Sequence, residues 1–474
     1  MRSSRTIWTV LLALLAAFAP PRGDFQAEYA AATKDLVPKL EAFADWCATV
    51  KLYAERDKAC EAILRFDASH EAAHRTLKHS RQRDGTWVVP EKRVESRNYG
   101  DKLKDGAAKR SAIVAEFRSK VVELVKAAGE ALEPAQRDAI FADVLAIDAE
   151  DAGSRELVGE VRRDEQWVVK EALTSKESRV ALKETIKTAV AGVPASSAAE
   201  LRGSEGELKV AWTSMVALPN VRVLSSGGLP EAQKVATMCA ATMAVFRKLT
   251  GATVEIPEGF TVYLLTTPVA RDAFLANWPG WSDDERARLK TWAGAGVPGD
   301  IHQARWDADE ARRLDGSVRH VIGLLTLLNY GYDHQKCAWA WEGVGLYLTR
   351  EIVGTRYTWY STGPATGDAD AKELLGKLMM TDVNWMNECF QRAKRGKAPK
   401  IAVLAERKID QFGVDEVLTS YALAAYLIEG RPDKLGAVLA KLGELGTVGS
   451  LEAALACDVA RLDERFVRWL GERK

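Results

Sequence analysis

The sequence has no excess of either charge and no C-x-x-C pair. Lysine and arginine number 66, aspartate and glutamate also number 66, and the net charge of the 474 residues is zero. No basic cluster interleaved with aromatic residues occurs, so we expect no nucleic-acid partner. The absence of C-x-x-C argues against a structural zinc site of the common kind.

Long apolar runs are also scarce. One short run, residues 7–18, follows Arg2 and Arg5 at the start of the chain. A positive segment followed by a short apolar run is typical of a secretory signal, which we place at residues 1–23; an uncleaved anchor is the alternative. No other stretch is long and apolar enough to cross a bilayer, so we expect no membrane span after cleavage and a periplasmic or extracellular location.

Export would permit disulfides, but the sequence does not choose among them. The six cysteines allow fifteen complete pairings. They are Cys47, Cys60, Cys239, Cys337, Cys389 and Cys457. Cys47 and Cys60 could bridge adjacent helices, and free buried thiols acting as small apolar groups are an equal alternative.

Residues 24–190 read as a helical region with an internal repeat. The units lie near 59–92 and 139–172, and both contain an aliphatic pair, an Asp-Ala break, a leucine and a Trp-Val-Val tail. Asp67 and Asp148 follow the first helix of each unit and are predicted to cap the next. Trp87 and Trp167 are predicted to close each helical pair, with ligand stacking as the minority interpretation.

These units resemble degenerate tetratricopeptide-like helical pairs, although their spacing is far longer than a single such repeat. The resemblance implies a surface that binds peptides or partner proteins. Packing against the next domain would explain the same pattern. Residues 191–204, rich in small side chains, are predicted to be a linker.

Beyond this linker the pattern changes to strands and helices. Alternation predicts strands at 208–212 and 221–225, a strong strand at 260–265 and an edge strand at 300–306. Helices are expected near 231–249, 269–278 and 283–293, around His320 and Glu342, and at 374–389, 414–428, 438–445 and 451–469. The fold class is therefore α+β and mostly helical, with a domain at 205–430 and C-terminal helices at 431–474 packed on it.

The segment His320-Val-Ile-Gly-Leu324 is followed, after eighteen positions, by Glu342. In zinc peptidases, H-E-x-x-H places two imidazoles on one helix face beside a glutamate base, and a later glutamate completes the ligands. Here Val321 stands at the base position and Leu324 at the second imidazole position. Neither side chain can bind a metal or move a proton, so catalysis is not expected.

This order of elements, with Trp341-Glu-Gly-Val-Gly-Leu-Tyr347, resembles the gluzincin or peptidase MA-like metallopeptidases. The resemblance implies a thermolysin-like small mixed sheet with a helical bundle. It makes His320 the counterpart of the first metal ligand and Glu342 that of the third. Tyr347 matches a position that packs behind the site.

Two alternatives stay open at this site. His320, His334 and Glu342 could form a zinc site of unusual ligands, with Asp333 as the base and His302 nearby on the edge strand. Without a metal, Glu342 needs a partner because a lone buried carboxylate is costly, and we predict a contact with His320, direct or through water.

The sequence therefore predicts an exported, non-catalytic protein that binds a polypeptide or cell-envelope component. No cofactor is expected. An active zinc metallopeptidase and a helical-repeat scaffold with an inert second domain are the alternatives. Eight of the fourteen tryptophans lie between residues 278 and 385, where core packing is the default; Trp278 and Trp281 are the pair most suited to an exposed binding role.

Overall fold

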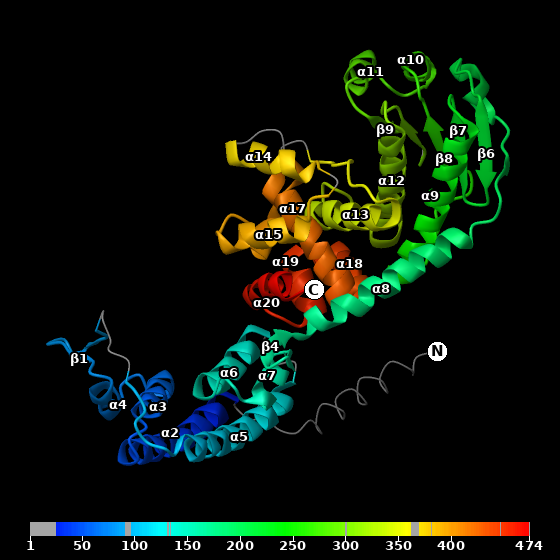
Figure 1. Ribbon diagram of the computed structural model, residues 1–474. Coiled ribbons are helices and arrows are strands. Elements are labelled where there is room, and N and C mark those ends of the chain that lie inside the picture. The colour runs from blue at the N-terminus through cyan, green and yellow to red at the C-terminus, as the bar shows by residue number, and fades with distance from the viewer. Residues whose placement is uncertain are drawn as a thin grey trace, which may run out of the picture. The chain divides into compact units, whose positions relative to one another are not determined.

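The computed structural model describes residues 25–90, 96–129, 132, 134–298, 301–361, 369–380, 382–445 and 447–473. The predicted signal segment lies outside these residues. The chain divides into two compact units, Met1–Trp167 and Val168–Lys474, and each is described by itself (Figure 1). No helix in the described part of the chain has both the length and the apolar character needed to cross a bilayer.

The first unit repeats one order of elements: a long helix, a second helix, a short helix and a two-stranded hairpin. The first copy is α2 (Phe25–Thr49), α3 (Tyr53–Phe66), α4 (Glu71–Thr76), β1 (Ser80–Arg81) and β2 (Trp87–Val88). The second copy is α5 (Leu103–Ala128), α6 (Pro134–Ile147), α7 (Ala152–Leu157), β3 (Glu160–Arg163) and β4 (Gln166–Val169). One apolar cluster spans both copies, because α2 packs on α5 and α3 on α6.

The helix breaks are built differently from the prediction. Asp67 and Asp148 do not cap the following helices; each accepts the amide two residues later, from Ser69 and Glu150, and so fixes the turn. The caps are three residues further on, where His70 accepts the Ala73 amide and Asp151 the Ser154 amide. The residue directly after a helix is too far from the next helix to reach its free N–H groups.

The two hairpin tryptophans cover the short helices. The ring of Trp87 stacks on the buried His74 of α4, with ring centres 4.2 Å apart. Trp167 donates its indole N–H to Glu150 and lies beside the guanidinium of Arg155. The tryptophan of the Trp-Val-Val tail thus contacts the short helix or the break before it in both copies, whereas Val88 and Val89 of the first copy are exposed.

The second unit begins with α8 (Lys170–Ala191), which the sequence assigned to the N-terminal region ending at residue 190. That boundary is wrong, because α8 packs on α9 and on the segment Tyr426–Gly430 of the second unit. Glu171 of α8 is 2% exposed and accepts from Arg465 and from the Tyr426 hydroxyl. An amphipathic helix shows its own apolar face in the sequence but not which neighbour covers it.

A six-stranded mixed sheet follows, in the order β5-β6-β7-β8-β10-β9. The strands are β5 (Ser197–Ala198), β6 (Ser214–Leu218), β7 (Val221–Ser225), β8 (Thr261–Leu264), β9 (Gly294–Gly296) and β10 (Gln303–Arg305). The pairs β7–β8 and β8–β10 are parallel, and the pairs β5–β6, β6–β7 and β10–β9 are antiparallel. The segment predicted as an edge strand at 300–306 is internal, and β9 is the edge.

Helices cover both faces of this sheet. Val223, Val262 and Leu264 face the cluster formed with α9 (Leu229–Thr250), whereas Leu224 and Tyr263 face α10 (Pro268–Asn277) and α11 (Asp283–Leu289). The predicted strand at 208–212 is wrong: η2 (Gly203–Leu208) ends at its first residue, and residues 209–212 have no regular structure. The range 191–204, predicted as a linker, is largely without regular structure and contains the short strand β5. Trp278 and Trp281, each 8% exposed, lie in the core beneath α10 rather than on a binding surface.

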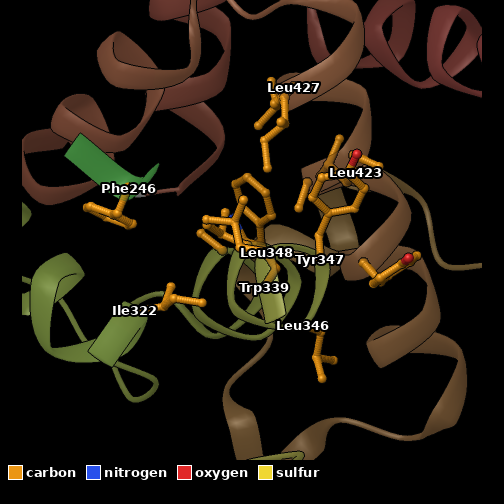
Figure 2. Packing of buried hydrophobic residues seen from close by; sticks show 14 of the residues in the cluster. Phe246, Ile322, Trp339, Leu346, Tyr347, Leu348, Leu423 and Leu427 are labelled. Atoms are coloured by element: carbon orange, nitrogen blue, oxygen red, sulfur yellow. The ribbon is translucent and has the colours of Figure 1, made fainter. Parts of the chain in front are cut away.

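The rest of the unit is helical. Its elements are α12 (Glu310–Tyr330), α13 (Ala338–Val353), α14 (Ala369–Leu378), α15 (Trp385–Lys394), α16 (Ile401–Glu406), η3 (Ile409–Gln411), α17 (Val414–Ala425), η4 (Tyr426–Gly430), α18 (Leu435–Leu445), α19 (Thr447–Leu455) and α20 (Val459–Glu472). The single helix predicted at 374–389 is two, α14 and α15. Figure 2 shows Trp339 and Tyr347 of α13 packed towards Leu423 and Leu427. Gly343 permits this approach, since a Cβ there would lie 2.1 Å from the Ser420 carbonyl oxygen of α17.

The cysteines are free thiols in this structure. Cys47 and Cys60 are both buried in the first unit's apolar cluster. Burial raises the pKa of the Cys47 thiol to about 11, which keeps it protonated and unreactive at neutral pH. Of the two alternatives for this pair, the structure has the free buried thiols.

Candidate functional site

Two consecutive helices, α12 and α13, carry the residues of the candidate site. Asp309 caps α12 by accepting the Ala311 amide, and Gly331, with φ of 69°, ends it. Asp333 then accepts the amides of Gln335 and Lys336, which fixes the turn into α13. The helices pack closely because residue 323 is glycine: a Cβ there would lie 2.6 Å from the Trp341 ring.

Glu342 lies fully buried on α13, and all of its partners come from this chain. Arg319 of α12, itself 1% exposed, donates from Nη2 to Oε2 at 2.8 Å and also to the Trp341 carbonyl oxygen. The other oxygen, Oε1, accepts the backbone amides of Tyr360 at 2.5 Å and Ser361 at 2.8 Å. Three donors, one guanidinium and two backbone amides, thus hold this carboxylate.

The position of Arg319 depends on two neighbours. Residue 345 is glycine, and a Cβ there would lie 1.7 Å from Arg319 Nη1, so any larger residue would displace the guanidinium. The guanidinium carbon also lies 4.9 Å from the centre of the Tyr360 ring, a cation–π distance. The site therefore has a preformed cavity for an arginine head group.

His320 does not form the predicted direct bond with Glu342. Its ring stacks on Phe260 with centres 6.2 Å apart, one ring nitrogen bonds the backbone of Ile301, and Nε2 has no partner among the described residues. Consecutive helix residues project about 100° apart, so Arg319 and His320 cannot both face α13. The sequence pattern predicted His320 as the partner of Glu342, but the rotation of α12 about its axis turns Arg319 towards Glu342 instead.

The other predicted site residues are dispersed. His334 lies beside Trp341 and Tyr360, with ring centres 5.8 Å from each. His302 Nδ1 accepts the Thr261 amide. Tyr347 is buried and donates to Glu429 at 2.7 Å.

The remaining positions are apolar, and no metal set is assembled. Val321 and Leu324 belong to the apolar core, as expected. Across the described residues, no three His, Cys, Asp or Glu side chains gather in a way that could hold a metal ion. The alternative set of His320, His334 and Glu342 is not brought together, since Glu342 is engaged by Arg319 and His320 faces Phe260.

A segment that the sequence did not single out covers this site. We call residues 355–361 the strap. Asp315 of α12, which is 0% exposed, accepts the Thr355 hydroxyl and the amides of Tyr357 and Thr358. With the two amides held by Glu342, two buried carboxylates fix the strap at both ends. Asp315, an aspartate among the apolar residues of α12, could have indicated a buried carboxylate in need of donors. Its partners could not be read from the sequence, because they lie about forty residues further along the chain.

The environment of His320 predicts a specific acid sensitivity. Burial lowers the pKa of His320 to about 4, so the folded protein holds the neutral ring while the unfolded chain protonates near 6.5. Because the unfolded chain binds this proton first, the contribution of His320 to the free energy of unfolding should be highest above pH 6.5. It should fall by roughly 3 kcal/mol as the pH is lowered from 6.5 towards 4. Replacing His320 with Asn should remove this part of the pH dependence, measured by urea unfolding between pH 4 and 7.

The matched control for that experiment is His334→Asn, in the connection between α12 and α13. It should leave the difference between pH 4 and pH 7 unchanged. Equal pH dependence in the wild type and in His320→Asn would contradict the buried neutral ring.

The chain matches no protein-family model, no curated protein and no solved structure. The site is therefore interpreted on its own geometry.

Proposed function

We propose that this is an exported protein whose second unit is a catalytically degenerate, metallopeptidase-like domain that binds a polypeptide or cell-envelope component. In this proposal the domain has the gluzincin, thermolysin-like arrangement of a small mixed sheet and a helical bundle. The first unit would add a tetratricopeptide-like helical surface for protein binding.

One observation supports the proposed loss of catalysis. A glutamate on the second helix of a gluzincin site is neutralised by a metal, and Glu342 is instead neutralised by the guanidinium of Arg319, 2.8 Å away. A guanidinium cannot activate water as a metal does, because it has no open coordination position. The residues of α12 supply no general base beside it: Val321 is aliphatic and the neighbouring His320 faces the sheet.

A retained enzyme would need a different ligand set. The sequence allowed an active zinc peptidase through His320, His334 and Glu342, and the observed partners of these residues do not favour it. The third candidate, a helical-repeat scaffold with an inert second unit, is favoured by no specific contact.

The test uses the chain from residue 24 onwards, purified without chelators. We expect far less than one zinc per chain by mass spectrometry and no casein hydrolysis that a chelator abolishes. Stoichiometric zinc that is lost in His320→Ala, together with hydrolysis restored by added divalent ions, would overturn the proposal. The parallel variant Val403→Ala, at an exposed position of α16, controls for changes unrelated to the site.

A further inference from the structure

Arg356 differs from the other buried arginines. Among the described residues, six arginines are at most 9% exposed, and five of them form an ion pair with a carboxylate. The paired ones are Arg222 with Glu205, Arg305 with Asp307, Arg313 with Glu231, Arg319 with Glu342 and Arg392 with Asp415. Arg356, at 9% exposed, has no such pair within the described part of the chain. A buried cation without an anion is costly, which points to a partner from outside.

The protein contacts of Arg356 satisfy only part of its guanidinium. Nη2 donates to the Val383 carbonyl oxygen at 2.8 Å, and the group lies 4.3 Å from the centre of the Trp385 ring and also bonds Tyr421. Nε is buried and has no hydrogen-bond partner among the residues that the structure describes. Glu351 acts on it electrostatically without forming an ion pair, and burial together with Glu429 raises the pKa of that carboxyl. Neutral and aromatic groups therefore hold Arg356 but do not neutralise it.

Arg356 lines a small, shallow pocket on the surface of the second unit. The described lining residues are Arg350, Gly354, Thr355, Arg356, Tyr357, Leu378, Met379 and Met380. Two of them are arginines and none is acidic. Arg350 donates to the Gly354 carbonyl oxygen and forms no ion pair with a carboxylate among the described residues. The described lining thus contains two arginines, neither of which forms an ion pair with a carboxylate among the described residues.

The opposite wall of the pocket is apolar and partly uncovered. Met379 is 42% and Met380 56% exposed, beside the buried Leu378. Methionine side chains adapt to apolar groups of different shape, and exposed adjacent methionines are typical of binding surfaces. An apolar wall beside two arginines suits an apolar residue that carries a negative charge, such as the end of a polypeptide chain.

We propose that the pocket between Arg350, Arg356 and Met380 binds the terminal carboxylate of a polypeptide whose last residue is apolar. The carboxylate pairs with the guanidinium groups, and the last side chain packs on the methionines. This proposal specifies a partner for the polypeptide-binding role proposed above. Carboxylate binding in this pocket depends on neither a metal nor hydrolysis. The experiment on the pocket and the experiment on zinc and hydrolysis can therefore fail separately.

Fluorescently labelled peptides ending in Ala-Leu test it directly by anisotropy on the full chain. The peptide with a free carboxylate should bind at least roughly tenfold more tightly than the same peptide with a terminal amide, because a charge-assisted hydrogen bond contributes about 1.5–3 kcal/mol. Octanoate and N-acetyl-leucine, added as competitors, distinguish a free aliphatic acid from a chain end: only N-acetyl-leucine should displace the peptide.

Two variants should remove this binding without touching the buried Arg356. Arg350→Gln deletes one cation; it should weaken the carboxylate peptide about tenfold and leave the amide peptide unchanged. Met380→Glu places a negative charge on the exposed wall and should weaken the carboxylate peptide at least as much. Lys377→Gln, which removes a nearby surface cation outside the lining, is the matched control and should bind as the wild type. Equal affinity for carboxylate and amide peptides, displacement by octanoate, no binding of either peptide, or full binding by Arg350→Gln would overturn the proposal.

Discussion

Replacement of Arg319 by methionine is expected to lower the free energy of unfolding of the second unit by about 3–5 kcal/mol, because it leaves the fully buried Glu342 carboxylate without its cation. Methionine fills much of the same space, so the loss measures charge and hydrogen bonding rather than a cavity. Urea unfolding followed by near-ultraviolet circular dichroism, which reports the tryptophans of this unit, gives the value.

The double variant Arg319→Met with Glu342→Met separates the ion pair from the packing. Removing both charges should cost less than the sum of the two single variants, since no unpaired ion remains. Arg312→Met, the control at an exposed position of the same helix, removes only a surface cation–π contact with Tyr357 and should change stability by about 1 kcal/mol or less. A loss from Arg319→Met as small as that of the control would show that Glu342 is neutralised by another group.

Replacing Asp315 with alanine should be nearly as damaging, with a loss of about 3 kcal/mol or more. Three strap donors, the Thr355 hydroxyl and the Tyr357 and Thr358 amides, lose a charged acceptor in a buried site. Because the strap is attached to the helices through carboxylates, its amides should also exchange with deuterium much faster. Mass spectrometry of the peptide that covers residues 355–361 measures this effect.

Thr355→Val is the matched variant for Asp315→Ala. It removes one of the three hydrogen bonds and keeps the carboxylate and both backbone donors, so we expect a loss of about 1 kcal/mol and slow amide exchange. Slow exchange in Asp315→Ala as well would mean that the strap is held by Glu342 and apolar packing alone.

Local patterns predicted most elements of the second unit. The apolar residues of α9 recur at helical spacing, and β7 and β8 coincide with the segments that alternation or β-branched content indicated. The segment at 300–306 was found but misplaced as an edge, because strand order depends on pairing between distant segments. The repeat in the first unit was visible because both copies keep the aspartate and tryptophan that build the break and the hairpin.

The candidate site was predicted only in part. Glu342 was identified as a carboxylate that needs a partner, and it has one. The partner was assigned to His320 because imidazole is the residue type that the motif requires. The sequence does not show how α12 is rotated about its axis relative to α13. A rotation of about 100°, which is one residue, decides whether His320 or Arg319 faces α13.

The sequence by itself determined that α12 and α13 carry no H-E-x-x-H chemistry, because aliphatic side chains at 321 and 324 cannot bind a metal wherever they point. It also determined that the carboxylate of Glu342, within an apolar helix, needs a cation or hydrogen-bond donors as partners. Only the tertiary structure decided which groups are these partners. Arg319 reaches Glu342 because glycines at 323 and 345 allow two helices to approach closely, and the strap adds its amides from residues that no local pattern connects to the site.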